Sequence, residues 1–64
     1  MDYATSQRII ASIRRAKQGF FKGVTIVKTP TGMGKTGINF YVDGSRVDLP
    51  KAIKIINDYE TYGS

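Results

Sequence analysis

The sequence predicts an α+β fold, α-β-β-β-α in chain order, with a three-stranded antiparallel sheet and two helices packed on one face. Three observations predict it. Apolar residues recur at helical spacing near both ends of the chain. Apolar and polar residues alternate in the central part, as they do in half-buried strands. The pair Asp43-Gly44 interrupts that alternation and is the preferred dipeptide of a two-residue type I′ hairpin.

The first predicted helix covers residues 3–18 and has one apolar and one basic face. The apolar face carries Ile9, Ile13, Ala16 and Phe20. The opposite side and its flank carry Arg8, Arg14 and Arg15. Asp2 or Thr5 suits the N-cap position, because a short side-chain oxygen can accept a hydrogen bond from a free amide there. Gly19 is a natural helix stop.

Two strands are predicted before the hairpin turn, over residues 21–28 and 36–42. Residues 29–35 are rich in Gly and Pro and are expected to form a flexible loop between them. A type I′ turn at Asp43-Gly44 then sets the register of a short third strand. It places Val42 opposite Ser45, Tyr41 opposite Arg46, and Phe40 opposite Val47. Tyr41 and Arg46 therefore share the outer sheet face, where the guanidinium can lie on the ring.

The second predicted helix covers residues 48–60, with Asp48 as N-cap and Pro50 in the first turn. We expect the chain to fray from Glu60 and residues 61–64 to form a tail. The expected core lies between the helices and the inner sheet face. It consists of Ile9, Ile13, Phe20, Ile26, Ile38, Phe40, Val42, Val47, Leu49, Ile53 and Ile56. The outer sheet face stays open to water or to a partner.

The composition restricts the chemistry. At 64 residues the chain is expected to be one small basic binding domain, residues 1–64. It has no Cys and no His, so disulfides, thiolate or imidazole metal sites and His-based catalysis lack their usual residues. We therefore expect no enzymatic activity, no metal and no cofactor. No apolar run suits a membrane span and the N-terminus does not resemble a secretory signal, which favours a cytoplasmic protein without a membrane partner.

Positive charge is concentrated in the first part of the chain. The net charge is +5, with seven basic side chains against one acidic before residue 37 and three against four after it. Such an asymmetry suggests an anionic partner for the first part. The alternative is a charged surface that serves solubility alone.

The segment from Thr29 to Thr36 reads TPTGMGKT and resembles motif I, the phosphate-binding loop of superfamily 2 helicases. The resemblance implies phosphate contacts from the loop amides and Lys35, and a magnesium contact from Thr36. It covers eight residues only, because such a loop must open a helix, whereas residues 37–42 alternate as a strand. The remaining interpretations are a hairpin loop that contacts nucleic-acid phosphates and a mobile tip whose glycines serve conformation alone.

Two further analogies concern nucleic acids. The element order resembles that of double-stranded RNA-binding domains, which implies phosphate contacts from Lys51 and Lys54. In that family a cluster of lysines at the start of the second helix contacts phosphates, and Pro50 stands here at the position of the first of these lysines. The loop histidine of that family is also missing here. Three-stranded sheets that enter the DNA major groove, as in integrase arm-binding domains, are a second analogy for the open face.

The first functional hypothesis is a non-catalytic nucleic-acid-binding module that contacts mainly the DNA or RNA backbone through the first helix and the Gly/Lys-rich loop. The alternative is a phage or mobile-element protein that inhibits or modulates a host protein by docking its basic face on an acidic surface. A homodimer is compatible with either. The candidate residues for the anionic partner are Arg8, Arg14, Arg15, Lys17, Lys22, Lys28, Lys35, Tyr41 and Arg46. As a group, the charges of the first helix fit a solvated face equally well.

Overall fold

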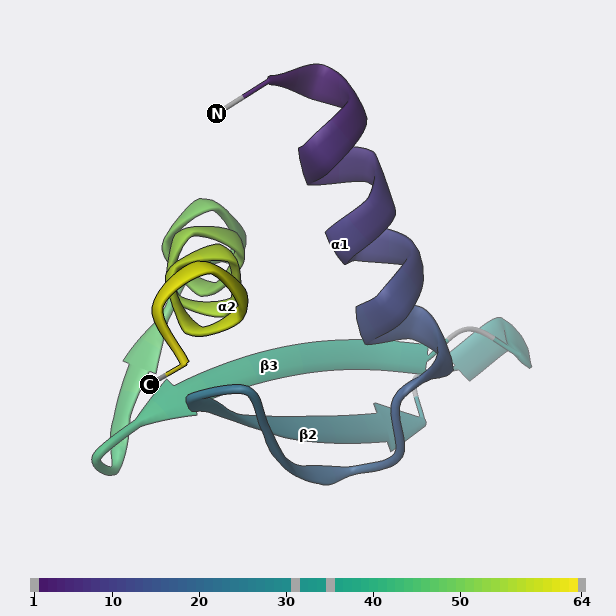
Figure 1. Cartoon of the computed structure of the whole chain (residues 1–64). Coiled ribbons are helices and arrows are strands. Elements are labelled where there is room, and N and C mark those ends of the chain that lie inside the picture. Colours follow the sequence, from purple (N-terminus) through teal and green to yellow (C-terminus); the bar gives the residue numbers. More distant parts are fainter. Residues whose placement is uncertain (1, 31, 35, 64) are drawn as a thin grey trace.

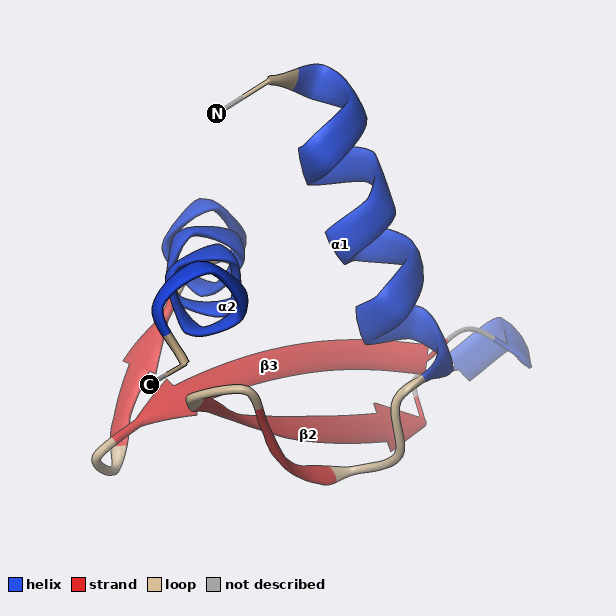
Figure 2. Cartoon of the chain, in the orientation of Figure 1, coloured by secondary structure: helices blue, strands red, loops and turns tan. Residues whose placement is uncertain are grey.

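A computed structural model describes residues 2–30, 32–34 and 36–63, and Figure 1 shows the arrangement of their elements. Helices α1 (Tyr3–Arg15) and α2 (Leu49–Tyr62) lie on one side of an antiparallel sheet, which confirms the predicted α+β class (Figure 2). The elements between the helices are β1 (Gly19–Phe21), β2 (Val24–Pro30), the 3₁₀ turn η1 (Gly32–Gly34), β3 (Thr36–Val42) and β4 (Ser45–Val47). No helix among the described residues is long and apolar enough to cross a membrane.

The sheet has four strands in the order β1-β2-β3-β4, so the predicted number of three was wrong. The missed strand is β1, which pairs with β2 through Phe20 opposite Thr25. Lys22 and Gly23 connect the two strands with φ values of 46° and 91°. Two successive positive φ angles define a type I′ hairpin turn, whose twist matches that of the flanking strands. The segment 21–28, predicted as one strand, therefore consists of the last residue of β1, this turn and the first part of β2.

The hairpin between β3 and β4 has the predicted register. Asp43 and Gly44 take φ values of 52° and 81°, as a type I′ turn requires. Tyr41 pairs with Arg46, and Phe40 pairs with Val47. The sequence alternation and the turn dipeptide together determine this half of the sheet.

The core lies between the two helices and the sheet. Its buried residues are Ile9, Ile13, Val24, Ile26, Phe40, Ala52, Ile53 and Ile56. Two predicted core residues lie elsewhere, since Phe20 is 74% exposed and Leu49 is 40% exposed. Phe20 pairs with Thr25, and Thr25 points away from the helices because successive side chains of a strand alternate between faces. Leu49 is the first residue of α2 and lies at the margin of the core.

Both helix ends differ from the sequence prediction. α1 ends at Arg15, because Ala16 takes an extended conformation with ψ 146°. The turns after it lead into β1. α2 continues to Tyr62 and does not fray at residue 60, because Gly63 adopts the left-handed conformation and its N–H donates to the Tyr59 carbonyl at 2.8 Å. The N-caps are as expected, with Asp2 accepting from the Thr5 amide and Asp48 from the Lys51 amide.

Candidate nucleic-acid interface

The sheet face opposite the helices carries a row of side chains that crosses all four strands. Phe20 in β1 pairs with Thr25 in β2, Thr25 pairs with Tyr41 in β3, and Tyr41 pairs with Arg46 in β4. Residues on either side of Thr25 are buried against the helices, whereas Thr25 itself is exposed. The name open sheet face denotes Phe20, Thr25, Val27, Asn39, Tyr41 and Arg46.

Phe20 is the residue of this row that the sequence did not reveal. Its ring is 74% exposed, although a phenylalanine normally lies in the core. The available signal was the Lys22-Gly23 pair, because a two-residue turn at that point places Phe20 opposite Thr25. Tyr41, two strands away, is half-buried, so the face offers two aromatic rings to solvent.

Arg46 lies at the edge of the open sheet face and is exposed. Its predicted position opposite Tyr41 is confirmed by the strand register. The expected stacking on Tyr41 is not seen. Among the described residues, the cation–π contact is instead made by Lys22, whose Nζ lies 5.4 Å from the centre of the Phe21 ring. The Arg46 guanidinium therefore remains available to a ligand.

A second group of available cations lies where α1 ends. Arg14, Arg15 and Lys17 are exposed, and their side chains form no ion pair or hydrogen bond with other described residues. These three residues are called the basic end of α1. The C-terminal end of α1 lies against β2, because Lys28 of β2 contacts carbonyls there. This is the end of the sheet where β2 leads into η1 (Figure 1).

Lys28 itself faces inward. Its Nζ donates to the Arg14 carbonyl at 3.0 Å and to the Ala16 carbonyl, so its ammonium caps the negative end of the α1 dipole. The Lys28 amide also donates to the Gln18 side-chain oxygen at 2.8 Å. Lys28 therefore joins α1 to the sheet, and its charge is directed at the protein's own carbonyls.

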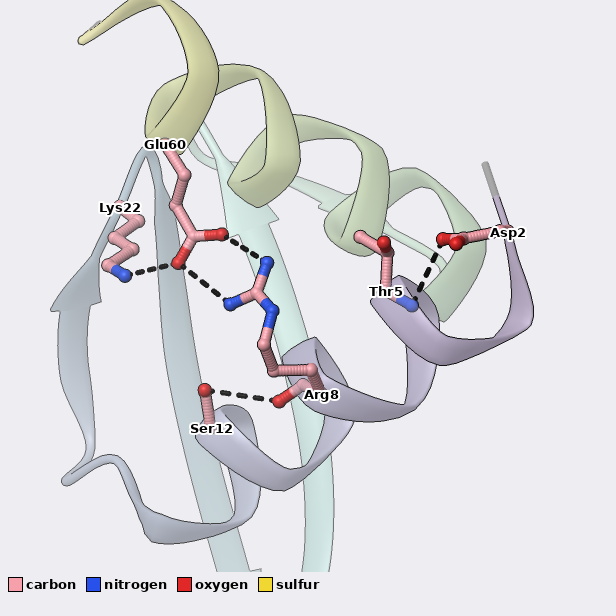
Figure 3. A network of polar contacts seen from close by, with 6 residues as sticks. All are labelled: Asp2, Thr5, Arg8, Ser12, Lys22 and Glu60. Atoms are coloured by element: carbon pink, nitrogen blue, oxygen red, sulfur yellow. Dashed lines mark hydrogen bonds and ion pairs between the residues drawn. The ribbon is translucent and has the colours of Figure 1, made fainter.

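Arg8 and Lys22, two further candidates, meet at a single carboxylate (Figure 3). Arg8 Nη2 lies 2.9 Å from Glu60 Oε1, and Lys22 Nζ contacts Glu60 Oε2. Hydrogen bonds from these two cations lower the pKa of Glu60 to about 2, and the pKa of Arg8 is raised by the same contact. Both cations are thus partly neutralised, and they lie apart from the basic end of α1.

The Gly-rich segment does not have the geometry of a phosphate-binding loop. Gly32–Gly34 form a single 3₁₀ turn, and β3 begins at Thr36, where such a loop would open a helix. Lys35, the remaining candidate, lies outside the described residues. Within the described ranges, no group of three or more Asp, Glu, His or Cys is placed to hold a metal ion.

Comparison with known protein families, with curated protein sequences and with solved structures finds no match for this chain. The fold, the open sheet face and the distribution of unpaired cations are therefore the observations from which its function is inferred.

Proposed function

We propose that this chain is a small nucleic-acid-binding module. In this proposal Phe20 and Tyr41 contact bases, while Arg46 and the basic end of α1 contact phosphates. The observation that carries the proposal is the row Phe20-Thr25-Tyr41-Arg46, which places the exposed Phe20, the half-buried Tyr41 and the exposed Arg46 on the sheet face opposite α1 and α2.

The pairing of charges indicates which cations take part. The five acidic side chains of the sequence all have structural positions. Two cap helices, one occupies the β3–β4 turn and two form ion pairs. Among the cations without an acidic partner, Arg46 and the basic end of α1 make no side-chain hydrogen bond with the described residues, so a phosphate can bind them without breaking such a contact. Phosphate recognition is therefore assigned to the end of α1 and not to Arg8 in its middle.

The test measures the affinity for labelled DNA and RNA by fluorescence anisotropy, at several salt concentrations between about 50 and 200 mM. The logarithm of the binding constant should fall linearly with the logarithm of the salt concentration, since each phosphate that binds a cation releases counterions. The variant Arg14→Ser/Arg15→Ser/Lys17→Ser should have a shallower slope, by about 0.7–0.9 for each phosphate that it no longer binds. Absence of binding at about 50 mM salt, or binding that salt does not affect, contradicts the proposal.

A control variant addresses net charge. Lys51→Ser/Lys54→Ser removes positive charge from α2, where Lys54 already pairs with Asp58 at 3.6 Å. If the proposal is correct, this variant keeps most of the salt slope, because the proposal assigns the phosphate contacts to Arg46 and the basic end of α1 and none to α2, which lies beside α1 on the other face of the sheet from the row (Figure 2). An equal decrease in slope per charge at both places would show that only net charge matters.

A second candidate function is binding to a host protein. The observation that favours it is an apolar groove of about 570 Å³ beside the N-terminus of α2, lined in part by Leu49, Pro50 and Ile53. Arg14 lines an adjoining hollow next to Leu49, so a partner segment with apolar side chains and a carboxylate fits this side. Retention of one protein from nuclease-treated lysate, abolished in Leu49→Lys but kept in Phe20→Thr, would favour this function over nucleic-acid binding.

A further inference from the structure

We infer that the open sheet face binds single-stranded nucleic acid, with bases stacked on Phe20 and Tyr41, and that it discriminates against duplexes. The inference rests on the proposed function and specifies its ligand. The two nucleic-acid analogies drawn from the sequence were both with proteins that bind duplexes.

The width of the sheet argues against insertion into a duplex groove. Neighbouring strands lie about 4.8 Å apart, so the outer strands of a four-stranded sheet are about 14 Å apart before side chains are added. The major groove of B-form DNA is about 12 Å wide and admits a helix or a two-stranded ribbon. The presence of β1 therefore removes the analogy with three-stranded sheets that enter the major groove.

The aromatic row suits bases that are already unstacked. Phe20 and Tyr41 are separated by β2, which puts their backbones about 10 Å apart. The residue between them is Thr25, which is small and exposed, so both rings can be reached by a flat ligand. Bases inside a duplex stack on one another and offer no free face, whereas bases of a single strand can stack on protein rings.

Cations flank this row at both edges of the sheet. Arg46 lies on the edge strand β4, and Lys17 precedes the other edge strand β1 by two residues. Arg14 and Arg15 come just before Lys17 in the chain, at the end of α1 on the helix side of the sheet. A single strand that crosses the sheet along the row would thus have its bases on the rings and its phosphates near a cation at each edge.

The experiment compares three ligands at one moderate salt concentration. They are a labelled mixed-sequence single strand, the same sequence as a duplex, and a single strand of equal length with abasic sites in place of bases. The single strand should bind at least about tenfold more tightly than either of the others, because stacking supplies about a tenfold gain per base. Two-dimensional NMR of the complex should show shifts of the Phe20 and Tyr41 ring signals.

Substitutions then test the two rings directly. Phe20→Thr and Tyr41→Thr, which remove the ring but introduce a β-branched residue that suits a strand, should each weaken single-strand binding by about five- to tenfold. Matched controls are Tyr3→Ala and Tyr62→Ala, because Tyr3 is 79% and Tyr62 is 76% exposed, close to the 74% of Phe20, but both lie on helices. The controls should change affinity less than twofold, and circular dichroism should confirm that all four variants fold.

The outcomes separate the inference from the proposed function. Duplex binding as tight as single-strand binding, or abasic binding as tight as normal binding, overturns the inference. The proposed function survives that result if binding still depends on salt. Equal decreases in affinity for the Phe20 and Tyr62 variants also overturn the inference. Absence of binding to all three ligands overturns both.

Discussion

Arg8 Nη2 donates a hydrogen bond of 2.9 Å to Glu60 Oε1 and thereby joins the second turn of α1 to the last turns of α2. The two residues are 52 positions apart in the sequence. Lys22, in the turn between β1 and β2, contacts the other oxygen of the same carboxylate. One carboxylate therefore connects both helices with the β1–β2 hairpin, on the side of the molecule away from the basic end of α1.

Replacement of Glu60 should make stability less dependent on pH. The folded-state pKa of Glu60 is about 2, below its ordinary value of 4.5, so the carboxylate stabilises the fold fully above about pH 4.5. That stabilisation disappears as the pH falls from about 4.5 to about 2. Glu60→Gln should lower the free energy of unfolding by about 1 kcal/mol at neutral pH, a value limited by solvent screening. The difference from the natural protein should vanish near pH 2.

Urea denaturation between about pH 2 and pH 6 measures this difference. Asp58→Asn is the control, because the Lys54–Asp58 pair at 3.6 Å lies within one helix and is largely exposed. Its effect should be smaller. A difference between Glu60→Gln and the natural protein that stays constant over this pH range contradicts the assignment.

Gly23 should be the least replaceable of the turn glycines. It has a φ of 91°, and a Cβ added to it would lie 3.0 Å from Ile55 Cγ2. Gly44 has a similar φ of 81° but open space around it. Gly23→Ala should therefore destabilise the protein more than Gly44→Ala, which costs about 1 kcal/mol from backbone strain alone. Thermal denaturation of both variants gives the comparison, and equal shifts would mean that Ile55 moves freely.

Local patterns predicted those parts of the fold that local forces determine. Helical spacing located both helices, and the turn at Asp43-Gly44 fixed the pairing of Tyr41 with Arg46. Strand β1 escaped detection because three residues are too few to show an alternation. In addition, Phe20 follows Ala16 by four positions, a spacing that also fits the apolar face of a helix.

The candidate site was predictable to a similar degree. The sequence identifies every cation but not its partner, since the contacts of Arg8 and Lys22 with Glu60 depend on how α1, α2 and the β1–β2 turn approach each other. The same is true of Lys28. Its sequence position indicates only a charged residue in a strand, whereas in the structure its ammonium donates to carbonyls at the end of α1. Tertiary packing therefore divides the predicted basic region into paired and available cations.

Lys28 should contribute to stability and not to binding. Lys28→Met keeps the aliphatic part of the side chain but removes the ammonium that caps α1, so it should lower the free energy of unfolding by about 1 kcal/mol. Lys54→Met, the control, removes only an exposed ion pair and should have a smaller effect. Urea denaturation measures both. A Lys28→Met protein with unchanged stability but weakened nucleic-acid binding would show that Lys28 contacts the ligand.

Arg46 should contribute to binding and not to stability. It is exposed on edge strand β4 and has no ion pair with the described part of the chain, so Arg46→Gln should leave the free energy of unfolding unchanged within about 0.5 kcal/mol. The salt slope for single-stranded nucleic acid should fall by about 0.7, the value of one phosphate contact. Lys51→Gln removes the same formal charge from α2 and should leave the slope unchanged. Anisotropy titrations of both variants over a range of salt concentrations decide the point. Equal slopes for the two variants would mean that Arg46 acts only through net charge and that the ligand does not reach the β4 edge of the open sheet face.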